Sequence, residues 1–181
     1  MLARVLHTPR LRLEAVTPEH AEGLWNAIER SLPELRRFMA WAPSASLENS
    51  RVFTQMMARR WEEVSEWTFV IVHDGEAAGT ISLSGYQSLF ALAEIGYWLR
   101  SDLSGRGLMT EAARAVSDFG FDEIGLHRIE LRAAVDNAGS IRIAEKLGFA
   151  REGLLREASW SERGYLDLYI YGLLAEERPA L

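Results

Sequence analysis

The sequence contains no cysteine, which excludes disulfide bonds, thiolate metal sites and a cysteine nucleophile. Its four histidines, at positions 7, 20, 73 and 127, lack the spacing of metal ligands. No apolar run approaches the ~20 residues that a membrane span requires, and residues 1–16 lack the apolar core and cleavage site of a signal peptide. We therefore expect a cytoplasmic protein with a metal-free mechanism and no membrane partner.

An excess of positive charge is also missing, because the formal net charge is −6. Binding to free nucleic acid needs clustered lysine and arginine, so we expect no nucleic-acid partner. The acidic balance mainly favours solubility and is compatible with a cationic partner. A chain of 181 residues, 48% of them hydrophobic and 25% charged, suits one globular domain over residues 1–181.

Short segments of alternating polar and apolar residues predict strands, and longer segments with apolar residues at helical spacing predict helices. The predicted strands are 10–16, a hairpin within 67–85 that turns at Asp74-Gly75, 91–99, 127–135, 155–160 and 167–174. The predicted helices begin at Thr17 and Pro33, cover 46–64, run from the 105–107 loop to about Gly120, and end at Gly148. In the 46–64 helix, the residues expected on the buried face are Leu47, Phe53, Met56, Met57 and Trp61.

This element order predicts a mixed α/β sheet. Strands that follow one another directly favour antiparallel pairing, whereas the two strands flanking the helix that ends near Gly120 should be parallel. Ligands of such sheets bind beyond the carboxyl ends of the strands. The connection after the 91–99 strand lies at such an end.

That connection, in "LRSDLSGRGLMTEAARAVSDFG" (99–120), places Gly105 and Gly107 on either side of Arg106. Glycine permits positive φ and close approach of a ligand, and the free N–H groups of a helix start bind phosphate. A P-loop is excluded because no lysine follows either glycine. A dinucleotide fingerprint fits poorly, since Thr110 stands where its third glycine belongs and Gly125 where an acidic residue is expected. The alternative is a loop that only connects the strand to the helix and binds no ligand.

The segment "AEIGYWLRSDLSGRGLMTEAARAVSDFGFDEIGLHRIELRAAVDNAGSIRIAEKLGFAREGLLRE" resembles the GNAT superfamily of acetyl-CoA-dependent N-acetyltransferases. It is most similar to the branch of ribosomal-protein N-terminal acetyltransferases, RimJ and RimL, which shares "GRGLMTEA", the pair Asn137 and Ser140, and "EKLGF". The opening "TPRLRLEAVTPEHAEGLW" and "LRRFMAW" extend the likeness over nearly the whole chain. The resemblance implies a mostly antiparallel sheet of about seven strands, helices on both faces, and a splayed parallel strand pair.

By this resemblance, the glycine loop binds the pyrophosphate of acetyl-CoA through backbone N–H groups from Ser104 to Thr110. The superfamily pattern Q/R-x-x-G-x-G/A is altered at its first and last positions, Ser104 and Met109, while Gly107 is retained. Arg106 faces either the phosphates or solvent, and Asn137 either holds the splay open, touches the cofactor or makes a local turn bond. The residues assigned to acetyl-CoA are Tyr97, Leu99, Ser104, Gly105, Arg106, Gly107, Leu108, Met109, Thr110, Asn137 and Ser140; Tyr97 and Leu99 would contribute main-chain groups.

The resemblance also implies direct attack of an amine on the thioester through a tetrahedral intermediate, with a general base and a general acid. The tyrosine acid of many superfamily members is replaced by Ala144, so Ser140 is the candidate acid, its alternative role being an N-cap. Glu94 is the candidate base. The other carboxylates in question are Glu152, Glu157 and Asp167.

The implied function is transfer of an acetyl group to a primary amine, with the N-terminus of a ribosomal or other protein as acceptor. The alternatives are a small-molecule amine (amino acid, polyamine or antibiotic) and a non-catalytic acyl-CoA-binding protein. We expect the acceptor cleft between the 17–64 helices and the 159–165 connection. Trp41, Trp67 and Trp160 lie in segments that look marginal, and RimL-like proteins often pair, so we also expect a homodimer.

Overall fold

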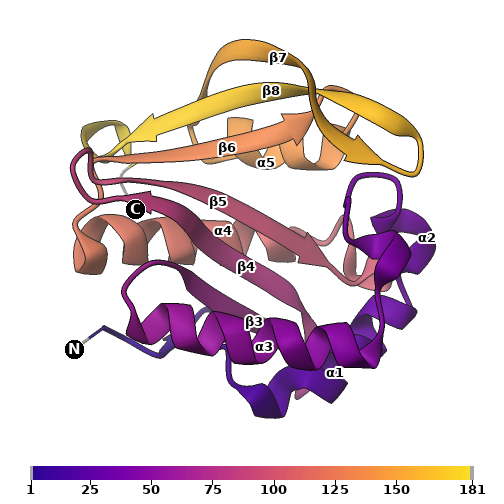
Figure 1. The fold of residues 1–181 in the computed structure, drawn as a ribbon. Coiled ribbons are helices and arrows are strands. Elements are labelled where there is room, and N and C mark those ends of the chain that lie inside the picture. Colours follow the sequence, from indigo (N-terminus) through magenta and orange to yellow (C-terminus); the bar gives the residue numbers. More distant parts are fainter. Residues whose placement is uncertain (1, 180–181) are drawn as a thin grey trace.

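The computed structural model describes residues 2–179, and its centre is an eight-stranded sheet in the order β1-β2-β3-β4-β5-β6-β8-β7 (Figure 1). The strands are β1 (Val5–His7), β2 (Arg12–Ala15), β3 (Trp67–His73), β4 (Glu76–Gln87), β5 (Leu92–Leu99), β6 (Arg128–Ala134), β7 (Ala150–Ser161) and β8 (Gly164–Leu174). The sequence predicted seven of them. It missed β1, whose three residues are too few to show an alternating pattern.

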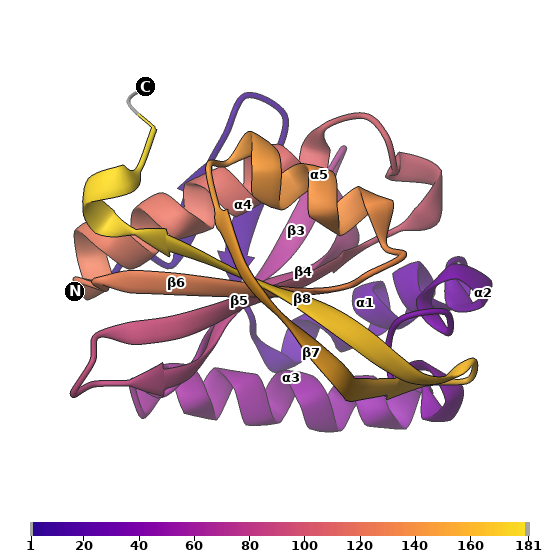
Figure 2. The same cartoon turned by 90° about the horizontal axis from the view of Figure 1, so that it is seen from above.

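The α-helices flank the sheet on both faces. They are α1 (Ala21–Glu29), α2 (Leu32–Leu35), α3 (Leu47–Glu62), α4 (Leu108–Phe119) and α5 (Ala138–Lys146). Figure 2 shows α4 and α5 on one side of the sheet and α1 and α3 on the other. No helix in residues 2–179 combines the length and apolar character needed to cross a membrane.

Among the described strand pairs, only β5 and β6 are parallel. They pair from Leu92 with Arg128 to Ile95 with Leu131, and then separate. β5 continues to Leu99 against β4, and β6 continues to Ala134 against β8. The divergence is visible in Figure 1. The predicted mixed sheet with one splayed parallel pair is therefore confirmed.

Two hydrophobic clusters lie on opposite faces of the sheet, because successive side chains of a strand alternate between faces. Phe69 of β3 packs edge-on against Phe119 of α4, with ring centroids 5.2 Å apart. The next residue, Val70, belongs instead to the cluster that contains Leu24 of α1 and Trp98 of β5. Burial of both faces fixes the register of the central strands.

Local turn and cap chemistry follows the sequence at several positions. The β3–β4 hairpin turns at Asp74 and Gly75, both with positive φ (51° and 80°), which is the geometry that an Asp-Gly pair favours. Thr17 precedes a short 3-10 helix, Pro18–His20, that leads into α1. Gly148 follows the end of α5 with a φ of 84°.

The brief helix predicted from Pro33 is a single turn, Leu32–Leu35, with Pro33 in its first positions. Two other expectations are wrong. In α3 the buried positions are Ser50, Thr54, Met57 and Trp61, so Met56 lies off this face and is 44% exposed. Trp67 is fully buried against the sheet rather than marginal, because β3 is a central strand.

Candidate active site

The glycine loop connects the carboxyl end of β5 to α4 through a 3-10 turn, Ser101–Leu103. Gly105 and Gly107 both have a φ of 78°, a conformation that residues with a Cβ adopt with strain. Gly107 is the N-cap residue of α4, and no side chain caps the first N–H groups of this helix. These N–H groups are therefore available to an anion.

Within the loop, Ser104 to Gly107 are exposed, whereas the side chains of Leu108 and Met109 are buried in the core. A ligand on the outside of the loop can therefore use only the backbone of these two residues. Arg106 is also exposed, and it is not among the described residues that line the cavity beside the loop.

The β1–β2 connection braces the loop from outside. The Arg10 side chain donates from Nη1 to the Arg106 carbonyl oxygen (2.9 Å) and from Nε to Glu111 Oε2 (2.7 Å). The other Glu111 oxygen accepts from the Thr8 hydroxyl at 2.6 Å. Burial alone would raise the pKa of Glu111, but the hydrogen bonds from Thr8 and Arg10 outweigh it and hold this pKa below its usual value. The loop conformation is thus fixed by residues about 100 positions earlier in the chain.

A cavity of about 390 Å³, which we call the loop cavity, lies between the glycine loop, the end of β5 and α5. Leu99, Ser104, Thr110 and both glycines are among its lining residues. Its charged lining residues are Glu34, Arg37, Arg142 and Lys146, an excess of positive charge. The loop cavity thus combines free backbone N–H groups with cationic side chains, an arrangement suited to phosphate groups.

A second cavity, of about 650 Å³, lies on the α1 and α3 side of the splayed strands, and we call it the apolar cavity. It is bordered by α1, the 38–46 connection, the start of α3, the end of β7 and the start of β8. These are largely the elements expected to form the acceptor cleft. Its position opposite the glycine loop separates the two candidate ligand sites.

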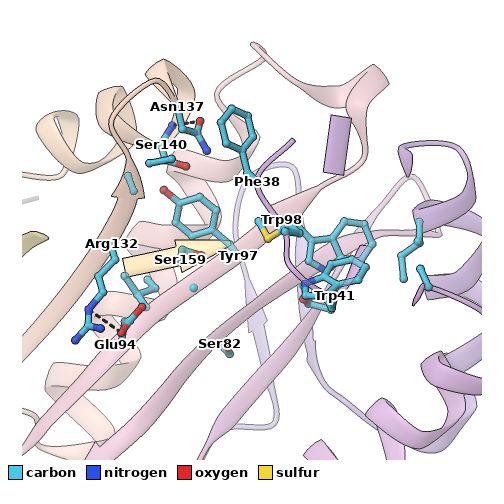
Figure 3. Close-up of a pocket in the computed structure, with 18 of the residues that line it drawn as sticks. Phe38, Trp41, Ser82, Glu94, Tyr97, Trp98, Arg132, Asn137, Ser140 and Ser159 are labelled. Carbon is cyan, nitrogen blue, oxygen red and sulfur yellow. Dashed lines mark hydrogen bonds and ion pairs between the residues drawn. The ribbon is translucent and has the colours of Figure 1, made fainter. Parts of the chain in front are cut away.

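The two cavities meet in the gap between β5 and β6. The residues that line both are Phe38, Met39, Tyr97, Trp98, Asn137 and Ser140. We call this set the junction (Figure 3). Two ligands entering from opposite cavities would touch each other here.

Ser140 lies in the first turn of α5, and its role as an N-cap is wrong. The N-cap is Asn137, whose Oδ1 accepts a hydrogen bond from the Ser140 backbone N–H at 3.2 Å. The Ser140 hydroxyl therefore does not cap the helix, and it points into the junction (Figure 3). Asn137 makes the local bond that its residue type favours and also lines both cavities.

The Tyr97 hydroxyl faces Ser140 across the junction (Figure 3). It is buried, and it has no hydrogen-bond partner of normal geometry among the described residues. Burial raises the pKa of Tyr97 to about 12, although the neighbouring Ser140 hydroxyl opposes this shift. The sequence assigned Tyr97 a main-chain role only, whereas its side chain brings a protonated hydroxyl to the junction.

Glu94 lines the apolar cavity, three residues before Tyr97 on β5. Its Oε2 lies 3.2 Å from Nε of Arg132 on β6 (Figure 3). Burial raises the pKa of Glu94, the Arg132 charge opposes this shift, and the Glu130 charge adds to it. A carboxylate of raised pKa at the edge of a cavity is suited to accept a proton.

The three other candidate carboxylates are not among the residues lining either cavity. Glu152 forms an ion pair with Arg128, which holds the pKa of Glu152 below its usual value. Asp167 accepts a hydrogen bond from the Glu157 backbone N–H at 2.8 Å.

Several residues that sequence reasoning missed belong to these cavities. Arg142 and Lys146, one turn apart on α5, both face the loop cavity, and their spacing after the "NxxS" motif was a usable signal. Arg37 and Trp41 come from an irregular connection within "LRRFMAW", a segment that the sequence analysis used only to extend the family likeness. Among residues 2–179, no group of three or more His, Asp or Glu side chains could hold a metal ion.

Comparison with known proteins identifies the family. Residues 10–150 match the model of the acetyltransferase (GNAT) domain. The chain belongs to this family. As a GNAT protein it is an acetyl-CoA-dependent N-acetyltransferase, and the resemblance to RimJ and RimL stated from the sequence is confirmed.

Individual relatives support this placement. The ribosomal-protein-serine acetyltransferase of Escherichia coli (strain K12) is 28% identical over 169 residues, which cover 93% of this GNAT chain and 94% of that protein. The spermidine N(1)-acetyltransferase of the same strain is 36% identical over 91 residues, covering 50% of this chain and 49% of that one. A solved structure of RimL, a ribosomal L7/L12 alpha-N-protein acetyltransferase in complex with coenzyme A, shares the fold with a TM-score of 0.89 at 23% identity, covering 94% of this chain and 97% of that one.

Proposed function

We propose that this GNAT enzyme acetylates the N-terminal α-amine of a protein, and that the acceptor is a ribosomal protein. The observation that carries the proposal is the junction, where a phosphate-binding loop cavity and a separate apolar cavity meet at Ser140 and Tyr97. Acetyl-CoA enters from the loop cavity, and the amine enters from the apolar cavity. The names of the E. coli relative and of RimL support a ribosomal-protein acceptor.

The loop cavity fits acetyl-CoA in three respects. The N–H groups at the start of α4 and the side chains of Arg37, Arg142 and Lys146 complement phosphate charge. Beyond Ile95, β5 is no longer paired with β6, so its backbone is open to an extended amide-containing chain. At the junction, where this path ends, the thioester would lie beside Ser140.

At the junction, the chain supplies one proton acceptor and one proton donor. Glu94 takes a proton from the attacking ammonium group, directly or through water, and so frees the amine lone pair for the carbonyl carbon. As the carbon–sulfur bond breaks, the Ser140 hydroxyl donates a proton to the departing thiolate and regains one from the attached nitrogen, which must lose its second proton to become an amide. General base and general acid each contribute roughly 10²- to 10⁴-fold in rate. Tyr97, kept protonated by burial, faces Ser140 as the nearest further hydroxyl.

A small-molecule amine is the second candidate acceptor, favoured by the partial match to a spermidine acetyltransferase. A thiol-release assay with acetyl-CoA separates the candidates. N-terminal peptides of ribosomal proteins should release thiol faster than a panel of amino acids, polyamines and amine-bearing antibiotics. Faster release with any small amine would contradict the proposal, and acetyl-CoA binding without release for every acceptor would favour a non-catalytic acyl-CoA-binding role.

The proposal includes a homodimer and a cytoplasmic location. β7 is an edge strand of the sheet, and Leu154, Trp160 and Tyr165 on β7 and β8 are 51%, 44% and 72% exposed. Such apolar exposure beside a free strand edge favours pairing with a second copy. Sedimentation at micromolar concentration should show a species of twice the 20.4 kDa chain mass, and a clean monomer would contradict the dimer.

A further inference from the structure

The apolar cavity contains very little charge. Of its described lining residues, Glu94 and Arg132 alone are charged, and they form an ion pair with each other. The Glu94 carboxylate is therefore the one anionic group that an incoming ammonium group can contact in this cavity. The other charged group, the Arg132 guanidinium, repels cations. A second positive charge on the acceptor would lose hydration without gaining a partner, and such burial is unfavourable.

Aromatic side chains form one wall of the same cavity. The rings of Trp41 and Trp98 are 6.1 Å apart with a tilt of 60°, and Phe38 lies nearby at the junction (Figure 3). Trp98 is 8% exposed and packs into the core, whereas Trp41 is 39% exposed. An exposed indole at the rim of a cavity gains by covering an apolar group of a ligand.

The remaining polar groups of the cavity are neutral. Ser44, Ser46, Ser82, Thr80 and Ser159 line it with hydroxyl groups. Hydroxyl groups both donate and accept hydrogen bonds, so they can serve the amide groups of a peptide but cannot neutralise a cation. The cavity thus offers one anionic site, an aromatic wall and neutral hydrogen-bonding groups.

We propose that the acceptor carries a single positive charge beside an apolar group: a peptide N-terminus whose second residue is apolar, with preference for an aromatic side chain. Trp41 and Trp98 select that side chain, and the lack of a second free carboxylate excludes polyamines. This inference rests on the proposed function, because it assumes that the amine enters through the apolar cavity.

The test uses three peptides that differ only at the second position, where they carry Phe, Ala or Lys after an N-terminal Ser, together with spermidine. We expect kcat/KM to fall at least about 10-fold from Phe to Ala and again from Ala to Lys, a factor of ten corresponding to about 1.4 kcal/mol. Spermidine should be slower than the Ala peptide. A Lys peptide or spermidine equal to or better than the Phe peptide would overturn the inference while leaving the acetyltransferase activity established.

A variant pair assigns the selectivity to the aromatic wall. Trp41→Ala should bring the Phe-to-Ala ratio of kcat/KM close to one, while calorimetry shows unchanged affinity for acetyl-CoA. Phe90→Ala is the matched control, because this aromatic residue is also exposed (62%) but is not among the lining residues of either cavity. It should keep the full ratio, and a ratio that survives Trp41→Ala would overturn the assignment.

Failure of the proposed function gives a different result. If wild-type protein binds acetyl-CoA but acetylates none of the four acceptors, the peptide-acceptor inference is wrong, and so is an N-terminal acceptor of this kind. If it does not bind acetyl-CoA, the placement of the cofactor in the loop cavity is wrong.

Discussion

The loop cavity and the apolar cavity meet at one junction but are built in opposite ways. The proposed anion-binding part of the loop cavity is one continuous stretch, residues 104–110, that would act through its backbone. The apolar cavity is assembled from side chains of segments between Leu24 and Leu168. A backbone site tolerates most substitutions except at its glycines, whereas a side-chain site can change its ligand with single substitutions. The comparison explains why acetyl-CoA could be predicted from motifs and the acceptor could not.

The largest expected effect comes from breaking the backbone site. Gly107→Val should weaken acetyl-CoA binding at least about 10²-fold, equivalent to about 2.7 kcal/mol. A φ of 78° is strained for a branched residue, so the first N–H groups of α4 turn away from the ligand. Isothermal calorimetry measures the loss.

Gly75→Val is the matched control for this strain. Gly75 has a φ of 80° in the β3–β4 hairpin, and it is not a lining residue of either cavity. Gly75→Val should lower the melting temperature about as much as Gly107→Val does, because the backbone strain is the same, but it should leave acetyl-CoA affinity intact. Undiminished binding in Gly107→Val would show that the loop is not the phosphate site.

The next effect concerns the junction itself. Ser140→Ala should lower kcat about 10²-fold with little change in acetyl-CoA affinity, because the proton is needed only as charge develops on sulfur. Asn137 keeps the helix cap in this variant, so thermal unfolding should be nearly unchanged. An unaltered kcat would remove Ser140 from the mechanism.

A loss of similar size is expected on the acceptor side. Glu94→Gln should lower kcat about 10²-fold near neutral pH, the lower end of a general-base contribution. Because burial raises the pKa of Glu94 above its ordinary 4.5, the wild-type rate should fall as pH drops through that raised value, where the base becomes protonated. The variant should lack this acidic limb. If the fall in rate at low pH persists in Glu94→Gln, the titrating group is not Glu94.

The smallest effect tests the contact between two junction residues, Tyr97 and Ser140. Tyr97→Phe should lower kcat about 10-fold, because it removes the hydroxyl that faces Ser140. The control is Tyr86→Phe, which alters a tyrosine packed on Trp67 and should leave kcat unchanged. If Tyr97 acts through Ser140, the double variant should be as slow as Ser140→Ala alone. Fully additive losses would mean that the two hydroxyl groups act independently.

Sequence predicted most of the fold because patterning and turn chemistry agreed, as at the Asp74-Gly75 hairpin and at Gly148. It failed where an element was short or a residue's neighbours were distant. β1 has too few residues to show a period, and Trp67 is buried by strands that its own segment does not reveal.

At the candidate site too, features with a local sequence pattern could be predicted, and contacts between distant segments could not. Gly105 and Gly107 signal their backbone geometry locally, whereas the meeting of Tyr97 with Ser140 joins two elements 43 positions apart, and Arg10 reaches the loop from 96 positions away. Such contacts are set by the sheet topology and leave no local pattern.

The short parallel seam between β5 and β6 has a thermodynamic consequence. Within residues 2–179, the strands β1–β5 and the strands β6–β8 are joined in the sheet only from Leu92–Arg128 to Ile95–Leu131. Beyond Ile95 and Leu131, a ligand that hydrogen-bonds to β5 replaces part of the missing strand pairing. The amide protons of Gly96 to Leu99 that face the gap should therefore exchange with solvent in the free protein and become protected once acetyl-CoA is bound, so that the co-substrate completes the sheet as well as supplying the acetyl group.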